Sequence, residues 1–162
     1  MSVSLYGSGQ TVIQVAQQVY TASSSTTSNS LVDTGLTLSI TPQSTTSKIL
    51  VLVNLNIGGG LGYTTGFQLN RAGSAIGTGT IGSSANQTAG AGTASNGGFM
   101  TASFSYLDSP STTSATTYKV QWRTQSGSPT AYINQTQYLS GGGDTYQAGT
   151  ISTITLMEIS GS

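Results

Sequence analysis

Short apolar runs separated by glycine, proline, serine and threonine recur along the chain, and the densest of them is 48–57. After Lys48, its first half is apolar at every position, and its second half alternates between apolar residues and asparagine. A run of this length, rich in branched residues, predicts a strand that is covered on both faces at one end and half-covered at the other. We expect one face of it to meet the core and the other to meet a partner chain; the core-facing residues are Ile49, Val51 and Val53, and the candidate subunit contacts are Leu50 and Leu52.

Eight further runs show the alternation or the β-branched content of strands. The clearest is 117–124, where Tyr118, Val120 and Trp122 alternate with polar residues. Turn residues recur at intervals of roughly ten to fifteen residues, and no run has a convincing helical period. The prediction is an all-β chain, an antiparallel β-sandwich that is jelly-roll-like and has eight or nine strands. The expected strands are 11–20, 31–40 (two pieces around Gly35), 48–57, 64–71, 75–76, 99–107, 117–124, 130–139 and 150–159.

The 162 residues are enough for one domain with its own core. Residues 1–10 are small and polar and are expected to form an N-terminal arm, and 11–162 to form a single sandwich domain. The glycines at 58–62 are expected to break the chain after the central strand. From 77 to 98 the only large apolar residue is Ile81, which predicts a long, weakly anchored loop.

Charge is scarce: eight charged side chains make up 5% of the chain and cancel to a net charge of zero. Ordinary domains carry roughly a quarter charged residues, so this surface has little electrostatic protection against association. We therefore expect a tight oligomer or a closed architecture. Four scattered basic residues cannot form a phosphate-binding patch, which excludes nucleic-acid binding as the main role. No run has the length or composition of a signal peptide or a membrane span, so synthesis and folding in the cytosol without membrane insertion are expected.

The residue types also argue against catalysis. The chain has no histidine and no cysteine, which removes the Ser-His-Asp triad, thiolate chemistry and most zinc sites. A carboxylate pair could still serve a glycosidase. However, Asp33, Asp108 and Asp144 all stand in turn contexts, and Glu158 could pair with Lys48, Lys119 or Arg123 instead. We expect no enzyme activity, no cofactor and no metal.

Two motif matches are weak. Gly77-Thr-Gly-Thr-Ile-Gly82 has the spacing of a dinucleotide-binding loop, but no helix-forming sequence follows it and no acidic residue stands about twenty positions on. The acceptor patterns at Asn86 and Asn134 are expected by chance in a chain so rich in serine and threonine.

The aromatic residues divide into two groups. Those on predicted strand faces, Phe67, Phe104, Tyr118 and Trp122, are expected in the core. Three others, Tyr63, Tyr138 and Tyr146, flank glycine loops. They are candidate contacts with a protein or glycan partner, and a tyrosine lid over one end of the sandwich is an equal alternative.

Several segments together resemble a family of tailed-bacteriophage virion proteins. The resemblance covers most of the chain, is weakest across 77–98, and rests on strand and turn patterns that carry no catalytic signature. It implies β-sandwich or jelly-roll domains that trimerise, as in capsid decoration proteins and tail-fibre tips. The segments are Gly7-Ser-Gly-Gln-Thr-Val-Ile-Gln-Val15, Leu36-Thr-Leu-Ser-Ile-Thr-Pro42, Ser47-Lys-Ile-Leu-Val51, Leu107-Asp-Ser-Pro110, Thr117-Tyr-Lys-Val-Gln-Trp122 and Ser152-Thr-Ile-Thr-Leu-Met-Glu158.

Two placements on a virion follow from this resemblance. A decoration or cement protein would sit on the outer surface of the capsid as a homotrimer and tie neighbouring major capsid subunits together. A tail-fibre or head-fibre tip would bind a host-surface receptor. The absence of a shaft repeat, a coiled coil or an attachment module in this chain favours the decoration role. A carbohydrate-binding or carbohydrate-acting module is the third class, and it would use the loop tyrosines.

Overall fold

The computed structural model describes residues 9–59, 64–79, 89–91, 98–124, 130–136 and 149–161. This part of the chain is all strand and loop, and it contains no helix long and apolar enough to cross a membrane. Seven strands have seven or more residues and four have three. The strands are β1 (Val12–Tyr20), β2 (Ser24–Thr26), β3 (Val32–Ile40), β4 (Lys48–Gly59), β5 (Thr65–Arg71), β6 (Ser74–Ile76), β7 (Ala89–Ala91), β8 (Phe99–Asp108), β9 (Thr116–Thr124), β10 (Ala131–Ile133) and β11 (Ser152–Ile159).

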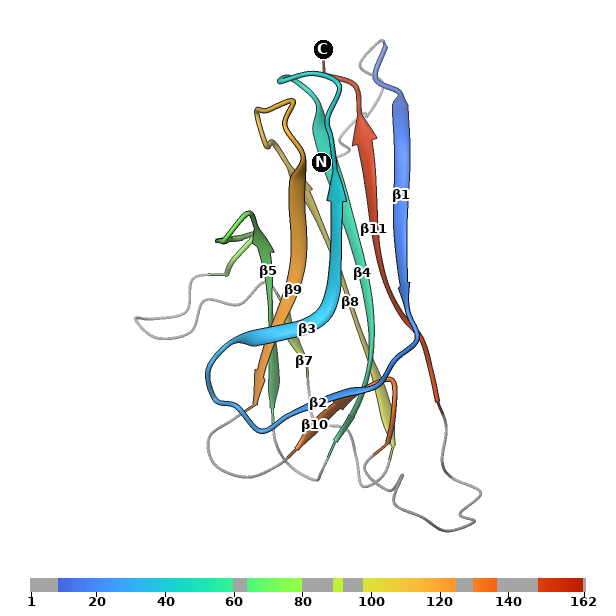
Figure 1. Ribbon diagram of the computed structural model, residues 1–162, viewed down its shortest axis with the longest axis vertical. Coiled ribbons are helices and arrows are strands. Elements are labelled where there is room, and N and C mark those ends of the chain that lie inside the picture. Colours follow the sequence, from blue (N-terminus) through green and yellow to red (C-terminus); the bar gives the residue numbers. More distant parts are fainter. Residues whose placement is uncertain are drawn as a thin grey trace, which may run out of the picture.

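The strands form two antiparallel sheets that pack face to face, with β3, β9 and β5 in front of β4, β8 and β11 in Figure 1. Sheet A has the order β1-β11-β4, with β8 also paired to β4, and β10 and β2 continuing from the far end of β4. Sheet B has the order β3-β9-β5-β6, with β7 also paired to β5. When three of the four short strands, β2, β7 and β10, are left out, the eight remaining strands, renumbered in chain order, fall into the orders 1-8-3-6 and 2-7-4-5, which are those of a jelly roll. The predicted β-sandwich is confirmed.

The core lies between the sheets and is built by strand alternation. In β4 the residues predicted to face the core, Ile49, Val51 and Val53, are buried. They meet Tyr118, Val120 and Trp122, the inward residues of β9, in one cluster. Because successive side chains of a strand point to opposite faces, Leu50 and Leu52 lie on the outside of sheet A.

The strand β4 is longer than predicted. We expected a break at Gly58, but β4 continues through Gly58 and Gly59 and pairs there with β10. The reason is close packing: a Cβ at Gly58 would stand 2.2 Å from the backbone oxygen of Gln135. The glycine therefore allows another backbone to approach the strand, and it does not end the strand.

Two other segments depend on special backbone geometry. Gly35 has φ +98°, the pairing of β3 with β9 shifts register between Asp33 and Thr37, and the Tyr20 ring fills the place of the missing side chain. The two predicted pieces of 31–40 are thus one strand, β3, with an irregularity in its pairing around Gly35. By contrast, the strand predicted over 130–139 ends at Ile133, because Asn134 has φ +61°.

Asn134 is a buried link between segments far apart in the sequence. Its Nδ2 donates to the backbone oxygens of Tyr20 (2.7 Å) and Ala22 (2.9 Å), and its Oδ1 accepts from Ser152 Oγ (2.7 Å). The amide of this glycosylation pattern is thus buried and hydrogen-bonded. The second pattern, at Asn86, lies outside the described residues.

The turn predictions for the carboxylates are wrong for both aspartates in the described chain. Asp33 belongs to β3, and Asp108 is the last residue of β8 and is buried. Arg71 Nη1 donates to both oxygens of Asp108 at 2.8 Å, and Tyr118 Oη donates to Asp108 Oδ2 at 2.7 Å. Burial, together with the bond to Asp108, raises the pKa of Tyr118 well above its usual value. This cluster connects sheet A with sheet B; Asp144 lies outside the described residues.

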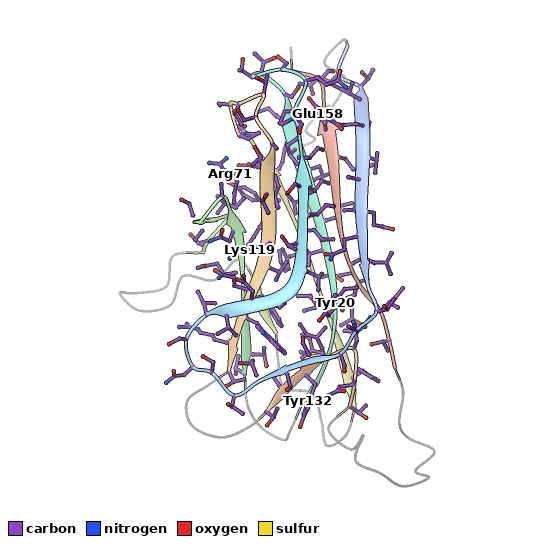
Figure 2. All side chains as sticks on the ribbon, in the orientation of Figure 1. Tyr20, Arg71, Lys119, Tyr132 and Glu158 are labelled. Atoms are coloured by element: carbon purple, nitrogen blue, oxygen red, sulfur yellow. The ribbon has the colours of Figure 1, made fainter. Side chains whose placement is uncertain are left out.

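Glu158 lies near the C-terminal end of β11, where Figure 2 labels it, and its inward-pointing side chain has no solvent exposure. It does not pair with Lys48, Lys119 or Arg123 as expected. Its carboxylate accepts hydrogen bonds from Gln14 Nε2 and from the backbone nitrogen of Gln43 (2.7 Å). Burial acts to raise the pKa of Glu158, but the hydrogen bonds to the charged form outweigh it and hold the pKa below its usual value.

We expect Glu158 to make the fold sensitive to acid. Because its folded pKa is lowered, its stabilising contribution is complete above the unfolded pKa and is lost as the pH falls through the folded pKa. Replacing Glu158→Gln should lower the free energy of unfolding by about 1–2 kcal/mol at pH 7. The difference from the natural chain should shrink below about pH 4.5. Urea unfolding between pH 3 and 7 measures this.

The control is Asp33→Asn. The hydrogen bond from Lys119 lowers the pKa of Asp33 too, but the Asp33 side chain is 57% exposed, so solvent screens the interaction. This variant should change stability little at any pH. An equal loss in the two variants would contradict the role given to Glu158.

Candidate association face

The exposed apolar residues gather on the outer side of sheet A. Eight large hydrophobic side chains are exposed in the described chain, and all but Val32 of β3 lie in β1, β4 or β8 or next to β11. We call the outward side of β1, β11, β4 and β8 the association face. Its exposed hydrophobic residues are Val12, Ile13, Val15, Val19, Leu52, Leu107 and Ile151.

Strand register places these residues in rows across the sheet. The partners Val15, Met157, Leu50 and Leu107 form one continuous apolar row from β1 to β8, which we call the apolar row. At its two ends Val15 is 55% exposed and Leu107 is 49% exposed. The next two rows are mostly hydroxyl and amide side chains: Gln17, Thr155, Leu52 and Ser105, then Val19, Thr153, Asn54 and Ser103.

Strand β1 has the reverse orientation of an ordinary amphipathic edge strand, because its polar side faces inward and its apolar side faces outward. Its partly buried residues include Gln14 and Gln18, while Val15 and Val19 point outward. The inward amides are used on the neighbouring sheet: Gln18 Oε1 accepts from the backbone nitrogen of Thr37 in β3 at 2.8 Å. Gln14 Nε2 donates to the backbone oxygen of Thr41 at 2.8 Å. The polar side of β1 thus closes the gap to β3, which leaves its apolar side facing solvent.

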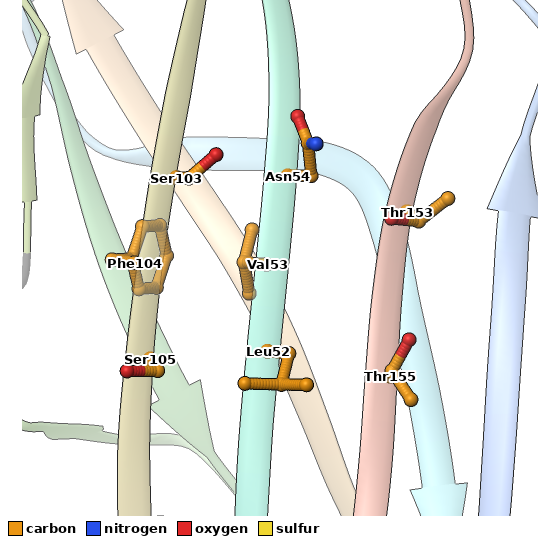
Figure 3. A pocket seen from close by; sticks show the side chains of 8 residues that line it. All are labelled: Leu52, Val53, Asn54, Ser103, Phe104, Ser105, Thr153 and Thr155. Carbon is orange, nitrogen blue, oxygen red and sulfur yellow. The ribbon is translucent and has the colours of Figure 1, made fainter.

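A groove of about 480 Å³ lies in the middle of the face (Figure 3). Side chains from β8, β4 and β11 surround it, with Leu52 beside hydroxyls and the Asn54 amide. None of its lining residues is charged. Such a surface can bury apolar area and exchange neutral hydrogen bonds with a partner, and it offers no ionisable group for catalysis. The groove is lined by Leu52, Val53, Asn54, Ser103, Phe104, Ser105, Thr153 and Thr155.

The two outer surfaces of the sandwich differ in charge. On the association face the one charged side chain in the described strands is Lys48, at one end, and its Nζ donates to Ser109 Oγ at 3.0 Å. On sheet B, Lys119 Nζ lies 2.9 Å from the Asp33 carboxylate, and Gln121 Nε2 donates to the same group at 2.8 Å. Figure 2 labels Lys119 on β9. Polar, ion-paired side chains therefore cover the sheet opposite the apolar row.

The predicted contact residues are placed unequally. Leu50 and Leu52 both lie on the association face, where Leu50 is part of the apolar row and Leu52 is 38% exposed. Tyr63, Tyr138 and Tyr146 lie outside the described residues. The sequence did not identify Val15, Met157 and Leu107 as contact residues. The alternation around them predicts strands, but it does not indicate which side of each strand faces outward.

Two carboxylates do come near each other. Asp108 and Glu158 are the register partners of Ile49 on its two sides, so they share one inward row about 10 Å apart. Each is buried and bound by its own partners, which makes them structural anchors on either side of Ile49. Within the described ranges, no three metal-ligating side chains come together. Of the glycine motif at 77–82, residues 77–79 follow β6, and the rest lies outside the described residues.

Comparison with known proteins adds little. No protein-family model matches this chain, and no curated protein matches it. Among solved structures, a chain in a structure of infectious bursal disease virus, Gx strain, aligns with a TM-score of 0.43 and 13% identity. The alignment covers 91% of this chain and 42% of that chain, so this chain spans less than half the length of the one it matches. A TM-score this low adds nothing to the sandwich that the strand pairing already shows.

Proposed function

We propose that this protein is a structural component of a bacteriophage particle, a decoration or cement protein on the outer surface of the capsid. The observation that carries the proposal is the association face, a sheet surface with one charged side chain, Lys48, at its end and an apolar row across its width. A surface of that kind is suited to permanent burial between the subunits of an oligomeric virion protein. The resemblance of the chain to tailed-phage virion proteins supports a phage particle as the assembly.

The mechanism would be the addition of buried interface between major capsid subunits. A protein that binds the assembled shell but not the separate subunits stabilises the shell by mass action. At a free concentration 100-fold above the dissociation constant, one such site contributes about 2.7 kcal/mol. Neither a cofactor nor a reaction is needed for this role, and a homotrimer would multiply the contacts that each bound unit makes.

The test is the addition of purified protein to phage shells that lack it. We expect the protein to sediment with assembled shells and not with separate capsid subunits, and to raise the temperature at which the shells open. Shells mixed with an unrelated sandwich protein of similar size are the control. Calorimetry and light scattering report shell opening.

Other results would support other roles. Binding to host cells without binding to shells would assign the chain to a tail-fibre or head-fibre tip that recognises a host receptor. Binding to a glycan array by the natural chain, lost when Tyr63, Tyr138 and Tyr146 are replaced, would assign it to carbohydrate recognition. Either outcome would overturn the decoration role.

A further inference from the structure

In a single copy of the chain, the association face exposes a continuous apolar row to water. In the described part of sheet A, the apolar row runs without interruption from one edge strand, β1, to the other, β8. Neither edge strand carries a lysine or a proline, the residues that commonly protect sheet edges. Face and edges together therefore form one continuous surface whose single outward charge in the described strands is Lys48, at one end.

The charge of the face favours a copy of the same chain as the occupant. A strongly acidic or basic partner would find little charge to pair with, because Asp108 and Glu158 point inward and Lys48, at one end, is the single charged side chain on the outward side of the described strands. Two copies of a face with one lysine at its end meet with little like-charge repulsion, and the chain as a whole has no net charge.

The rows then restrict how copies can be related. Rotation about an axis parallel to the strands keeps every row at its own level, so the apolar row of one copy meets the apolar row of the next, and hydroxyl rows meet hydroxyl rows. A two-fold axis perpendicular to the strands reverses the order of the rows. It would bring the apolar rows of two copies together only if the axis lay at the level of that row. The rows of Val19 and Asn56 would then extend beyond the interface, and Lys48 would face the row of Leu52.

We propose that the association face is the interface between copies of this chain, related by a rotation axis parallel to the strands of sheet A. Val15 at the β1 edge of one copy lies beside Leu107 at the β8 edge of the next. This holds for a two-fold or a three-fold axis, because in both cases the β1 side of one face meets the β8 side of its neighbour.

The face is large enough for this role. Four strands spaced about 4.8 Å apart and eight residues of about 3.3 Å each cover roughly 500 Å² per copy. About a two-fold axis, two such faces bury roughly 1,000 Å², the lower limit for a specific interface. The inference does not depend on the proposed virion role, since it concerns the purified chain alone.

Cross-linking between introduced cysteines tests the geometry, because the natural chain has none. The variant with both Val15→Cys and Leu107→Cys is treated with a thiol-specific cross-linker shorter than the width of the face. Within one copy the two positions are three strand spacings apart, about 14 Å, so that reagent can join them only between copies. We expect covalent oligomers in the large majority of the molecules.

The matched control pairs Val15→Cys with Thr101→Cys, an exposed position on the same face of β8 about 20 Å along the strand from Leu107. This pair should give at least ten-fold less product. Equal product from both pairs would overturn the proposed register of rows. Efficient cross-linking of Val15→Cys alone would show an axis perpendicular to the strands and overturn the proposed axis.

Light scattering tests the association itself. The natural chain should be oligomeric at micromolar concentration, and Val15→Asp or Leu107→Asp should be monomeric, while Ser39→Asp on the exposed side of sheet B should not change the mass. The three positions are exposed in the single chain, so the variants should fold, which circular dichroism checks. A monomeric natural chain that still binds shells would overturn this inference and leave the virion role intact. A cross-linked oligomer that binds no shell would support this inference and overturn the virion role.

Discussion

Replacing Arg71→Met is expected to lower the free energy of unfolding by about 3 kcal/mol. The substitution keeps most of the length of the side chain but removes the charge that compensates buried Asp108. The loss should fall at the lower end of the range for a broken buried pair, because the Arg71 side chain is 30% exposed and Tyr118 Oη still donates to Asp108. Denaturant unfolding measures the change.

The matched control is the same replacement in the other ion pair of the described chain, Lys119→Met. The Asp33 side chain of that pair is 57% exposed, so we expect a change of less than about 1 kcal/mol. A double variant, Arg71→Met with Asp108→Asn, should recover part of the lost stability, because the unpaired carboxylate is gone. A double variant less stable than Arg71→Met alone would contradict this explanation.

Gly58→Ala is expected to cost about 3 kcal/mol or more, enough to unfold a marginal domain. The new Cβ would stand 2.2 Å from the backbone oxygen of Gln135, and a backbone atom cannot rotate away as a flexible side chain can. Either β4 or the segment after β10 must then move, which also disturbs the buried link at Asn134.

The neighbouring glycine is a close control. At Gly59 the nearest atom to a new Cβ is the Thr130 oxygen at 3.7 Å, an ordinary contact. Gly59→Ala should therefore be nearly neutral, with a change below about 1 kcal/mol. Thermal unfolding of both variants measures the difference, and similar losses at the two positions would show that the cost comes from the strand's glycines in general and not from the approach of Gln135.

Alternation was sufficient to predict the elements in which one face is entirely apolar. In β9 and β4, the side chains assigned to the core are the ones that the structure buries. Gly35 was recognised because a glycine interrupts an otherwise regular alternation, and it does mark a bulge. Between the two strands predicted over 64–71 and 75–76, the chain turns at Ala72 and Gly73, and both have positive φ.

The orientation of β1 could not be predicted in the same way. Its valines follow strand spacing, but the strand faces outward because Gln14 and Gln18 satisfy backbone groups of β3 and the segment after it, and that need arises only once the sheets are packed. Asp108 and Glu158 were likewise misjudged because their partners, Arg71 and Gln14, are 37 and 144 residues away in the sequence. The sequence therefore predicted Leu50 and Leu52 as part of the candidate site. The other residues of the site could be found only from the pairing of strands far apart in the sequence.

The position of β11 has a consequence for the timing of folding during synthesis. In sheet A the last described strand lies between β1, the first, and β4. The backbone of Thr11 reaches Ser160 across a separation of 149 residues. At ribosomal rates of about 5–20 residues per second, β1 waits on the order of ten seconds for its partner. The apolar row is therefore assembled only when translation of this domain ends, so a nascent chain on the ribosome has no finished surface with which to capture its neighbours prematurely.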